Sequence, residues 1–191
     1  SITTGTLELI LNSDKVLQEP GRDVTYYLAL YNRSDEELYN VVGNLLIENH
    51  ITIASAESLT GGLFAKTITD VPGISEVFDR GIVTYTNRAK IDELGVDPDT
   101  LDKYGAVSEE TAREMAQGLH KKTGCDICVS ATGIAGPGGG TPDKPVGLVY
   151  MGIWHDDTCD VRKIVVNIPS RKVVRNSAML NMFDMIYKAI R

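Results

Sequence analysis

One stretch decides how this sequence is interpreted: Thr132-Gly-Ile-Ala-Gly-Pro-Gly-Gly-Gly-Thr-Pro-Asp-Lys-Pro-Val-Gly-Leu-Val149. It places four glycines and one proline between Gly136 and Gly140, and it joins the apolar runs 127–131 and 146–153. Ordered glycine costs backbone entropy, so such a cluster indicates either left-handed turns or main chain that approaches a ligand closely. Because the flanking runs are typical of buried strands, we interpret the stretch as a ligand-binding loop. The alternative is a long, functionless hairpin tip.

The bulk composition indicates a globular chain with one core: 191 residues, 42% hydrophobic and 24% charged. We find no apolar run near the ~20 residues that span a bilayer, and no signal peptide at the start. Three cysteines, an odd number, favour a reducing compartment, so we expect a cytoplasmic protein without a membrane partner. The net charge of −7 argues against a nucleic-acid partner, although a few local arginines can still hold a small anion.

Apolar periodicity divides the chain into a short N-terminal extension, residues 1–33, and a main domain, residues 34–191. The extension contains two strand-like runs and is expected to form strands or a hairpin. The main domain opens with a capping box at Ser34–Glu37. After it, expected strands near 51–56, 77–85, 127–131, 146–153 and 160–167 alternate with expected helices near 60–69, 89–94, 97–100, 108–119 and 170–191. This alternation predicts an α/β fold, a three-layer α/β/α sandwich around a mixed sheet.

A second glycine-bearing junction, Ala54-Ser-Ala-Glu-Ser-Leu-Thr-Gly-Gly62, lies between an expected strand and an expected helix. Such a junction presents main-chain N–H groups beyond the carboxyl end of the strand, and Ser58 is placed to meet a ligand there. The local logic is similar to a nucleophile elbow, although Gly-x-Ser-x-Gly itself is absent. The alternative is that Ser58 or Thr60 only caps the helix.

A nucleophilic serine needs a base, and none of the three histidines is a natural one. His50 is expected at a helix end, His120 on an exposed helix face and His155 in a turn. A lysine serves where burial or a neighbouring cation lowers its pKa. Tyr85 at a strand end and Lys90 in the first turn of the next helix are the candidates, against the alternative that Lys90 is a solvated surface lysine.

Several motifs, taken in order, closely resemble the CinA C-terminal domain family of nicotinamide-nucleotide amidohydrolases (NMN deamidases). They are Ala56-Glu-Ser-Leu-Thr-Gly-Gly62, Gly81-Ile-Val-Thr-Tyr-Thr-Asn-Arg-Ala-Lys90 with Leu94-Gly-Val96, Gly105-Ala-Val-Ser108 and the stretch from Thr132 to Gly147. The resemblance covers roughly residues 34–191.

The resemblance implies hydrolysis of the carboxamide of nicotinamide mononucleotide to nicotinate mononucleotide and ammonia, in pyridine nucleotide recycling. It assigns the catalytic roles to Ser58, Tyr85 and Lys90. We infer acyl transfer: Ser58 attacks the amide carbon and Lys90 accepts its proton, directly or through Tyr85. The oxyanion is expected to be held by main-chain N–H groups near Thr60 to Gly62 or in the glycine loop. The scheme requires no metal and no organic cofactor.

The substrate phosphate and ribose also need partners. The residues expected to bind substrate are Glu57, Thr60, Gly61, Gly62, Thr132, Gly133, Gly136, Gly138, Gly139, Arg171 and Arg175. Arg171 and Arg175 lie one helical turn apart and can share a face, with solvated first-turn cations as the alternative. Glu57 either orients Lys90 or the ribose, or is structural.

The chain departs from the family pattern in two places. Leu59 stands where the family commonly has cysteine, so that cysteine cannot be the catalyst if this chain is active. Residues 1–33 match no part of the separate nucleotide-pyrophosphatase-type domain of the longer proteins, so that second activity is expected to be absent. A long apolar C-terminal helix and the habits of the family favour a homodimer.

Two other functions compete with the amidohydrolase. A short-chain oxidoreductase also uses Ser, Tyr and Lys, but its Tyr-x-x-x-Lys spacing is one residue shorter than Tyr85 to Lys90 and its dinucleotide fingerprint is missing. The second alternative, a non-catalytic nucleotide-binding or accessory module of the competence/damage-inducible type, is not excluded by the sequence.

The motif Cys125-Asp-Ile-Cys128 could suggest a metal site, but the chain has no second Cys-x-x-Cys. On a regular strand its two cysteines would also point to opposite faces, so we expect buried cysteines and no metal site.

Overall fold

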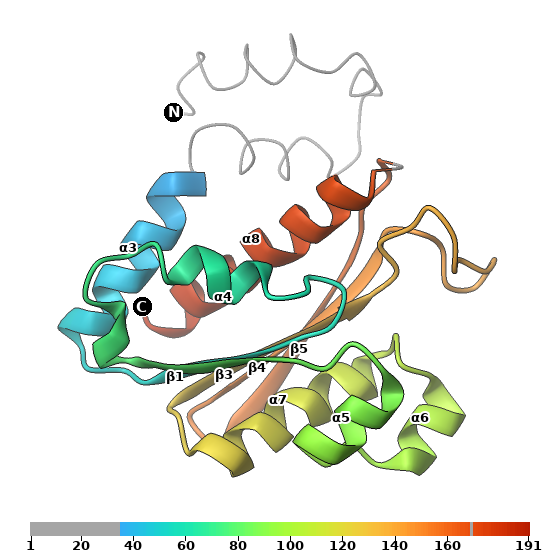
Figure 1. The fold of residues 1–191 in the computed structure, drawn as a ribbon, viewed down its shortest axis with the longest axis horizontal. Coiled ribbons are helices and arrows are strands. Elements are labelled where there is room, and N and C mark those ends of the chain that lie inside the picture. The colour runs from blue at the N-terminus through green and yellow to red at the C-terminus, as the bar shows by residue number, and fades with distance from the viewer. Residues whose placement is uncertain (1–34, 169) are drawn as a thin grey trace, which may run out of the picture.

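The computed structural model describes residues 35–168 and 170–191, shown as a ribbon in Figure 1. In chain order the elements are α3 (Asp35–Glu48), β1 (Ile53–Glu57), α4 (Leu63–Ile68), the 3-10 helix η2 (Ile74–Glu76), β2 (Phe78–Val83), α5 (Asn87–Leu94), α6 (Pro98–Tyr104), α7 (Glu109–Thr123), β3 (Ile127–Gly133), β4 (Leu148–His155), β5 (Thr158–Val165) and α8 (Arg171–Ala189). The expected N-terminal extension, residues 1–33, and the expected cap Ser34 lie outside the described residues.

Five strands form one mixed sheet in the order β2-β1-β3-β4-β5. β1 pairs in parallel with β2 and β3, whereas β4 pairs antiparallel with β3 and with β5. The expected mixed sheet is therefore confirmed. The carboxyl ends of β1, β2 and β3 meet at the same edge, where an open α/β sheet usually binds its ligands.

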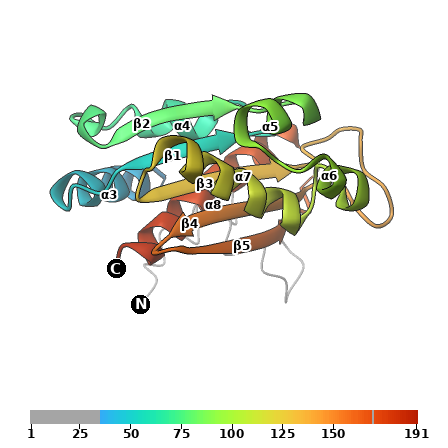
Figure 2. The same ribbon diagram turned by 90° about the horizontal axis from the view of Figure 1, so that it is seen from below.

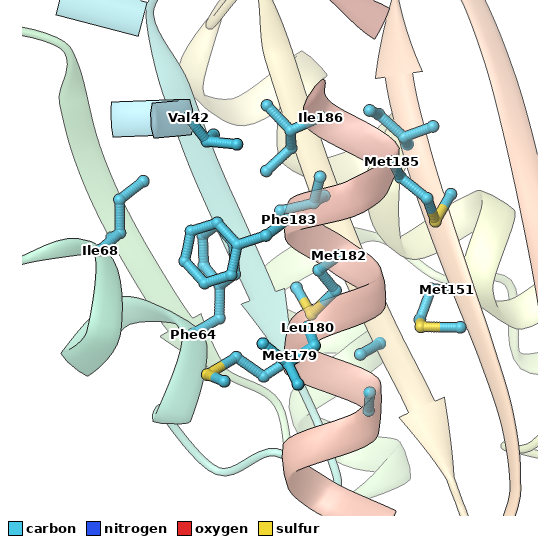
Figure 3. Packing of buried hydrophobic residues seen from close by; sticks show 14 of the residues in the cluster. Val42, Phe64, Ile68, Met151, Met179, Leu180, Met182, Phe183, Met185 and Ile186 are labelled. Carbon is cyan, nitrogen blue, oxygen red and sulfur yellow. The ribbon is translucent and has the colours of Figure 1, made fainter. Parts of the chain in front are cut away.

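Helices cover both faces of the sheet, which confirms the expected α/β/α sandwich. α3, α4 and α8 lie on one face and α5, α6 and α7 on the other (Figures 1 and 2). On the first face Phe64 of α4 stacks on Phe183 of α8, with ring centroids 4.5 Å apart (Figure 3). On the second face a smaller apolar cluster joins Ala54 and Ala56 of β1 to Met115 and Leu119 of α7.

Two serines cap helices, and one helix begins later than expected. Ser108 and Ser170 cap α7 and α8, each accepting a hydrogen bond from the main chain three residues on. α4 begins at Leu63 and not near residue 60, because the intervening residues form a tight turn. In that turn the N–H of Gly61 donates to the Ser58 carbonyl at 3.0 Å, and Gly62 has a φ of 91°.

The apolar side of α8 is buried in the core of this chain. Four residues of α8 are fully buried against the sheet, α3 and α4: Val174, Ala178, Met182 and Ile186. Figure 3 shows Met182 and Ile186. The argument for a homodimer from an apolar C-terminal helix therefore loses its support. Of the helices the structure describes, none has the length and apolar character needed to cross a bilayer.

Candidate active site

The structure brings Ser58 and Lys90 together at the carboxyl end of β1. Ser58 directly follows β1, and Lys90 reaches it from the first turns of α5, with Nζ 3.1 Å from Oγ. Thr86 caps α5 by accepting a hydrogen bond from Ala89 N–H, which fixes the helix start and hence the direction of Lys90. The sequence places these two residues 32 positions apart, so their contact is a product of the β1–β2–α5 topology.

Lys90 is 1% exposed, which excludes the alternative of a solvated surface lysine. Its Nζ also donates to the carbonyl of Thr84 at 2.8 Å. Burial disfavours the ammonium form and lowers the pKa of Lys90 from 10.5 to about 8. A lysine with this pKa is a competent general base near neutral pH.

Glu57 lies next to Ser58 in the chain but on the opposite face of the sheet. It is fully buried, and its carboxylate accepts hydrogen bonds from the N–H groups of Gly62, Phe64 and Ala65 at 3.1, 3.0 and 2.9 Å. A carboxylate at this position neutralises the unpaired donors and the positive end of α4. Of the two roles expected for Glu57, this geometry favours the structural one.

The same contacts narrow the expected oxyanion site near Thr60 to Gly62. The N–H of Gly62 is held by Glu57 and that of Gly61 by the Ser58 carbonyl, so neither donates to an oxyanion in this arrangement. Among the described residues, the main-chain N–H groups of Leu59 and Thr60 have no acceptor, and they lie directly after Ser58. They are the better candidates near the nucleophile.

Tyr85 is 56% exposed, and its hydroxyl accepts a hydrogen bond from Arg171 Nη2 at 2.7 Å. Arg171 also donates through Nη1 to the carbonyl of Gly136 at 2.9 Å. Arg171 thus joins Tyr85 at the end of β2 to the start of the glycine loop. Lys90 contacts Ser58 without Tyr85 between them, so the direct proton route is the one this geometry provides.

Arg175 holds the loop that carries Ser58. Its Nε donates to the carbonyl of Leu59 at 3.0 Å and its Nη2 to that of Thr60 at 2.7 Å. The expected pair, Arg171 and Arg175, therefore projects from one side of α8 onto two different loops of the site. Neither is a solvated cation without contacts.

The glycine loop connects β3 to β4 and is closed at its base by the hydrogen bond from Gly147 N–H to the Ile134 carbonyl, 2.8 Å. Gly136 has a φ of 80°, and a Cβ there would lie 2.6 Å from Val146 Cγ1, so loop geometry requires glycine. Gly138 has open space around its Cα, and no turn geometry or packing accounts for it. Among the described residues, the N–H groups of Gly138 and Gly139 have no acceptor, as an anion cradle needs.

Three further expected residues lie beside the dyad. Ser58 N–H donates to the Ala131 carbonyl at 3.0 Å, which places Thr132 and Gly133, at the end of β3, alongside Ser58. The Thr132 hydroxyl donates to the Ala106 carbonyl at 2.6 Å. Thr60 is fully buried, and its hydroxyl has no partner in the described part of the chain.

Histidines and cysteines contribute to structure elsewhere. Within the described residues, no histidine contacts Ser58 or Lys90; His120, expected on an exposed face, is instead half-buried and stacks on Trp154 at 4.7 Å. Cys125 precedes β3, so the opposite-face argument does not apply to it, and it packs with Cys128 in the second core cluster. Burial raises the pKa of Cys128 to about 12, as expected of an inert buried thiol.

A separate cavity of about 390 Å³ lies between the β4–β5 hairpin and the end of α8, lined in part by His155, Arg162 and Lys188. Trp154 pairs with Cys128 near the start of β3, so this hairpin lies at the opposite end of the sheet from Ser58. Arg162 and Lys188 are already paired with Asp184, at 2.6 and 2.9 Å. The cavity is not part of the candidate active site.

Sequence reasoning missed Thr84. It follows β2, its N–H donates to the Glu57 carbonyl at 2.9 Å, and its own carbonyl holds Lys90. Only its position directly before Tyr85 could have indicated a role in the site. Every residue type has a main-chain carbonyl, so a contact through that group cannot be predicted from the side chain.

Comparison with known proteins decides the family. The family model described as "CinA C-terminal domain" matches residues 35–190. The chain belongs to the CinA C-terminal domain family. A competence-damage inducible protein of Acetivibrio thermocellus is 54% identical over 162 residues, and a CinA-like protein of Kosmotoga olearia is 48% identical over 161. These matches cover 85% and 84% of this chain but 39% of each relative, so the chain spans about two fifths of their length.

Solved structures of CinA-type proteins share this fold. The competence/damage inducible protein CihA from Agrobacterium tumefaciens superposes with a TM-score of 0.81 at 37% identity, over 83% of this chain and 97% of that chain. A CinA superfamily protein from Klebsiella pneumoniae gives a TM-score of 0.78 at 27% identity, over 83% and 98%. The α/β architecture is therefore that of the CinA superfamily.

Proposed function

We propose that this CinA-family chain is an amidohydrolase that converts nicotinamide mononucleotide to nicotinate mononucleotide and ammonia, in cytoplasmic recycling of pyridine nucleotides. The observation that carries the proposal is the buried contact between Ser58 Oγ and Lys90 Nζ at 3.1 Å. A serine beside a lysine of lowered pKa is a nucleophile and its base, which an accessory binding module does not need.

The first half of the reaction is acyl transfer. Neutral Lys90 takes the proton of Ser58 as Oγ attacks the carboxamide carbon, and the carbonyl oxygen becomes an oxyanion. The N–H groups of Leu59 and Thr60 support that charge, and each such donor is typically worth ~3 kcal/mol of barrier. The Lys90 ammonium then gives its proton to the amide nitrogen, the C–N bond breaks and ammonia leaves.

The second half regenerates the enzyme. Water attacks the acyl–Ser58 ester while Lys90 accepts a proton from it, and the tetrahedral adduct collapses to nicotinate mononucleotide. Lys90 returns the proton to Ser58 Oγ. The scheme consumes one water and is balanced without an oxidant or reductant.

The substrate phosphate is assigned to the cradle formed by the Gly138 and Gly139 N–H groups with Arg171. Arg171 donates to the Gly136 carbonyl and to the Tyr85 hydroxyl and still carries other N–H donors, and Gly138 and Gly139 follow Gly136 closely in the loop. We assign a substrate contact to Tyr85, which is exposed and accepts a hydrogen bond from this arginine.

Ammonia release from nicotinamide mononucleotide, measured with nicotinamide and nicotinamide riboside in parallel, tests the proposal. We expect release from the mononucleotide at pH 8 and none from Ser58→Ala, with both proteins folded. A folded wild-type chain that binds the mononucleotide and releases no ammonia would leave the non-catalytic nucleotide-binding module as the function.

A further inference from the structure

Near the dyad the Thr84 hydroxyl, like that of Thr60, has no partner within the described residues. Thr84 is fully buried, and its Oγ1 makes no hydrogen bond within the described residues. Leaving a buried hydroxyl unsatisfied costs about 1–3 kcal/mol, and native structures contain few such groups. Of the unpartnered atoms in the described chain, this one belongs to the residue whose carbonyl already holds Lys90.

The pleat of the sheet places the Thr84 side chain on the side of Lys90. Val83 pairs with Glu57 across β2 and β1, and Glu57 points onto α4. Because side chains alternate along a strand, the next residues in each strand, Thr84 and Ser58, point to the other face, where α5 lies. The contact of Ser58 Oγ with Lys90 confirms that direction for its own strand.

The donors of Lys90 show when this hydroxyl contributes most. An ammonium carries three N–H groups, whereas a neutral amine carries two and a lone pair. Ser58 Oγ and the Thr84 carbonyl are the two partners of Nζ in the described structure. In the neutral amine the lone pair accepts from the Ser58 hydroxyl and one N–H donates to the Thr84 carbonyl, so one N–H lacks an acceptor in either state. Once Lys90 is protonated that N–H belongs to a cation, and a hydrogen bond from it is roughly twice as strong.

We propose that Thr84 is a positioning residue whose hydroxyl accepts the third N–H of the Lys90 ammonium, after Lys90 has taken the proton of Ser58. The proposal rests on the amidohydrolase function above. No bond changes except the transfer of that proton from Ser58 Oγ to Lys90 Nζ, and Thr84 keeps its own proton throughout. A hydrogen bond from the charged Nζ to this hydroxyl is stronger than one from the neutral amine, which favours the step that forms the charge.

No described carboxylate replaces this acceptor. Burial is the cause of the lowered pKa of Lys90, without a contribution from a neighbouring charge. Glu57 points onto α4, the Tyr85 hydroxyl is held by Arg171, and Arg88 and Asp92 of α5 form an exposed pair.

The test compares Thr84→Val, which keeps the shape and removes the hydroxyl, with Thr84→Ser, which keeps the hydroxyl. We expect kcat for ammonia release to fall about 10- to 100-fold in Thr84→Val and to be largely retained in Thr84→Ser, as for loss of a hydrogen bond to a charged group. Losing an acceptor of the ammonium lowers the pKa of Lys90, so the acidic limb of the pH–rate profile moves to lower pH by about one unit. Tm stays the same or rises, because the lost hydroxyl had no partner.

Thr67→Val is the matched control. Thr67 is also a buried threonine, but its hydroxyl donates to the Leu63 carbonyl at 2.8 Å within α4 and has no role in the dyad. We expect a lower Tm and an unchanged kcat and pH limb. If Thr84→Val does not fold, Thr84→Ala removes the same hydroxyl with less bulk.

A substrate-independent arm separates this proposal from the function on which it rests. The rate at which phenylmethanesulfonyl fluoride modifies Ser58, followed by intact mass against pH, reports the same ionisation without nicotinamide mononucleotide. A slower reaction with a shifted limb in Thr84→Val supports the proposal even if the mononucleotide is not hydrolysed. Three results would each overturn the proposal. The acidic limb of Thr84→Val could lie at the wild-type pH, Thr84→Ser could lose as much activity as Thr84→Val, or Ser58 could fail to react with the reagent.

Discussion

Glu57 and Ser58 are consecutive residues, yet they serve two regions of the molecule that differ in how their polar groups are satisfied. On the α4 face, the buried Glu57 carboxylate receives three main-chain N–H groups. On the α5 face, the buried Lys90 ammonium has one hydroxyl and one carbonyl, and an unpartnered Thr84 hydroxyl lies on the same residue as that carbonyl. The charge of the first region is matched by hydrogen bonds, whereas in the second region burial disfavours the ammonium and lowers the pKa of Lys90.

The largest effect is expected from breaking the reactive region. Ser58→Ala and Lys90→Met should each lower kcat for ammonia release by about 10⁴-fold or more, as for members of a catalytic unit. Lys90→Met should also raise Tm below pH 8, because it removes a desolvated cation. Lys66→Met, an exposed lysine of α4, is the control and should keep wild-type activity. If Lys90→Met kept its activity, Lys90 could not be the general base.

The pH dependence follows from the pKa of Lys90, lowered to about 8 by burial. The neutral amine is the base, so kcat/KM should rise about tenfold per unit below pH 8 and level off above it. For stability, the unfolded lysine binds its proton up to about pH 10.5 and the folded one only to about pH 8. Unfolding free energy should therefore rise between these values, by up to roughly 3 kcal/mol from this group. Chemical denaturation across this range, against Lys90→Met as reference, measures it; a flat difference would contradict it.

Breaking the compensated region should affect stability first. Glu57→Gln replaces a charge-assisted acceptor by an amide whose NH₂ faces the α4 donors, and we expect a loss of roughly 2–3 kcal/mol in unfolding free energy. Glu114→Gln is the matched control, since Glu114 also accepts two hydrogen bonds, from Asp97 N–H and the Thr100 hydroxyl, but at the α6–α7 junction. Its loss should be smaller and its activity retained. If both variants lost the same unfolding free energy, the hydrogen bonds of Glu57 to α4 would have no special importance for stability.

A smaller effect is expected at the anion cradle. Arg171→Ala should raise KM for nicotinamide mononucleotide about tenfold or more, with a lesser change in kcat, because a phosphate contact is lost. Nicotinamide riboside, which has no phosphate, should show no such change in KM. An equal change for both substrates would assign Arg171 to holding Tyr85 and the glycine loop alone.

The smallest effects are expected in the glycine loop, where two substitutions separate a structural glycine from one that contacts ligand. Gly136→Ala should destabilise the chain, since its φ of 80° is left-handed and the new Cβ would meet Val146 at 2.6 Å. Gly138→Ala enters open space and should leave Tm within about 1 °C, with a weaker substrate affinity as the readout of close approach. A neutral Gly138→Ala in both assays would mean that this glycine serves neither packing nor ligand.

The sequence was informative where local chemistry and spacing decide the outcome. It was possible to predict the helix starts near residues 108 and 170 and the alternation of strands and helices. The pairing of Ser58 with Lys90 was predictable through recognisable motifs. What could not be predicted depends on which strands are neighbours and which face a side chain takes. The β2-β1-β3 order brings the carbonyl of Thr84 to Lys90, and the turn at Gly61–Gly62 delays α4 and turns its first N–H groups onto Glu57.

The central claim is that Ser58, activated by Lys90, forms an acyl-enzyme, and partitioning with hydroxylamine tests it most directly. Hydroxylamine intercepts an acyl–serine ester, so wild-type protein should convert nicotinamide mononucleotide into the hydroxamate of nicotinate mononucleotide in a share that grows with hydroxylamine concentration. Ser58→Ala should form none. Hydrolysis that yields only the acid at every hydroxylamine concentration would contradict the account.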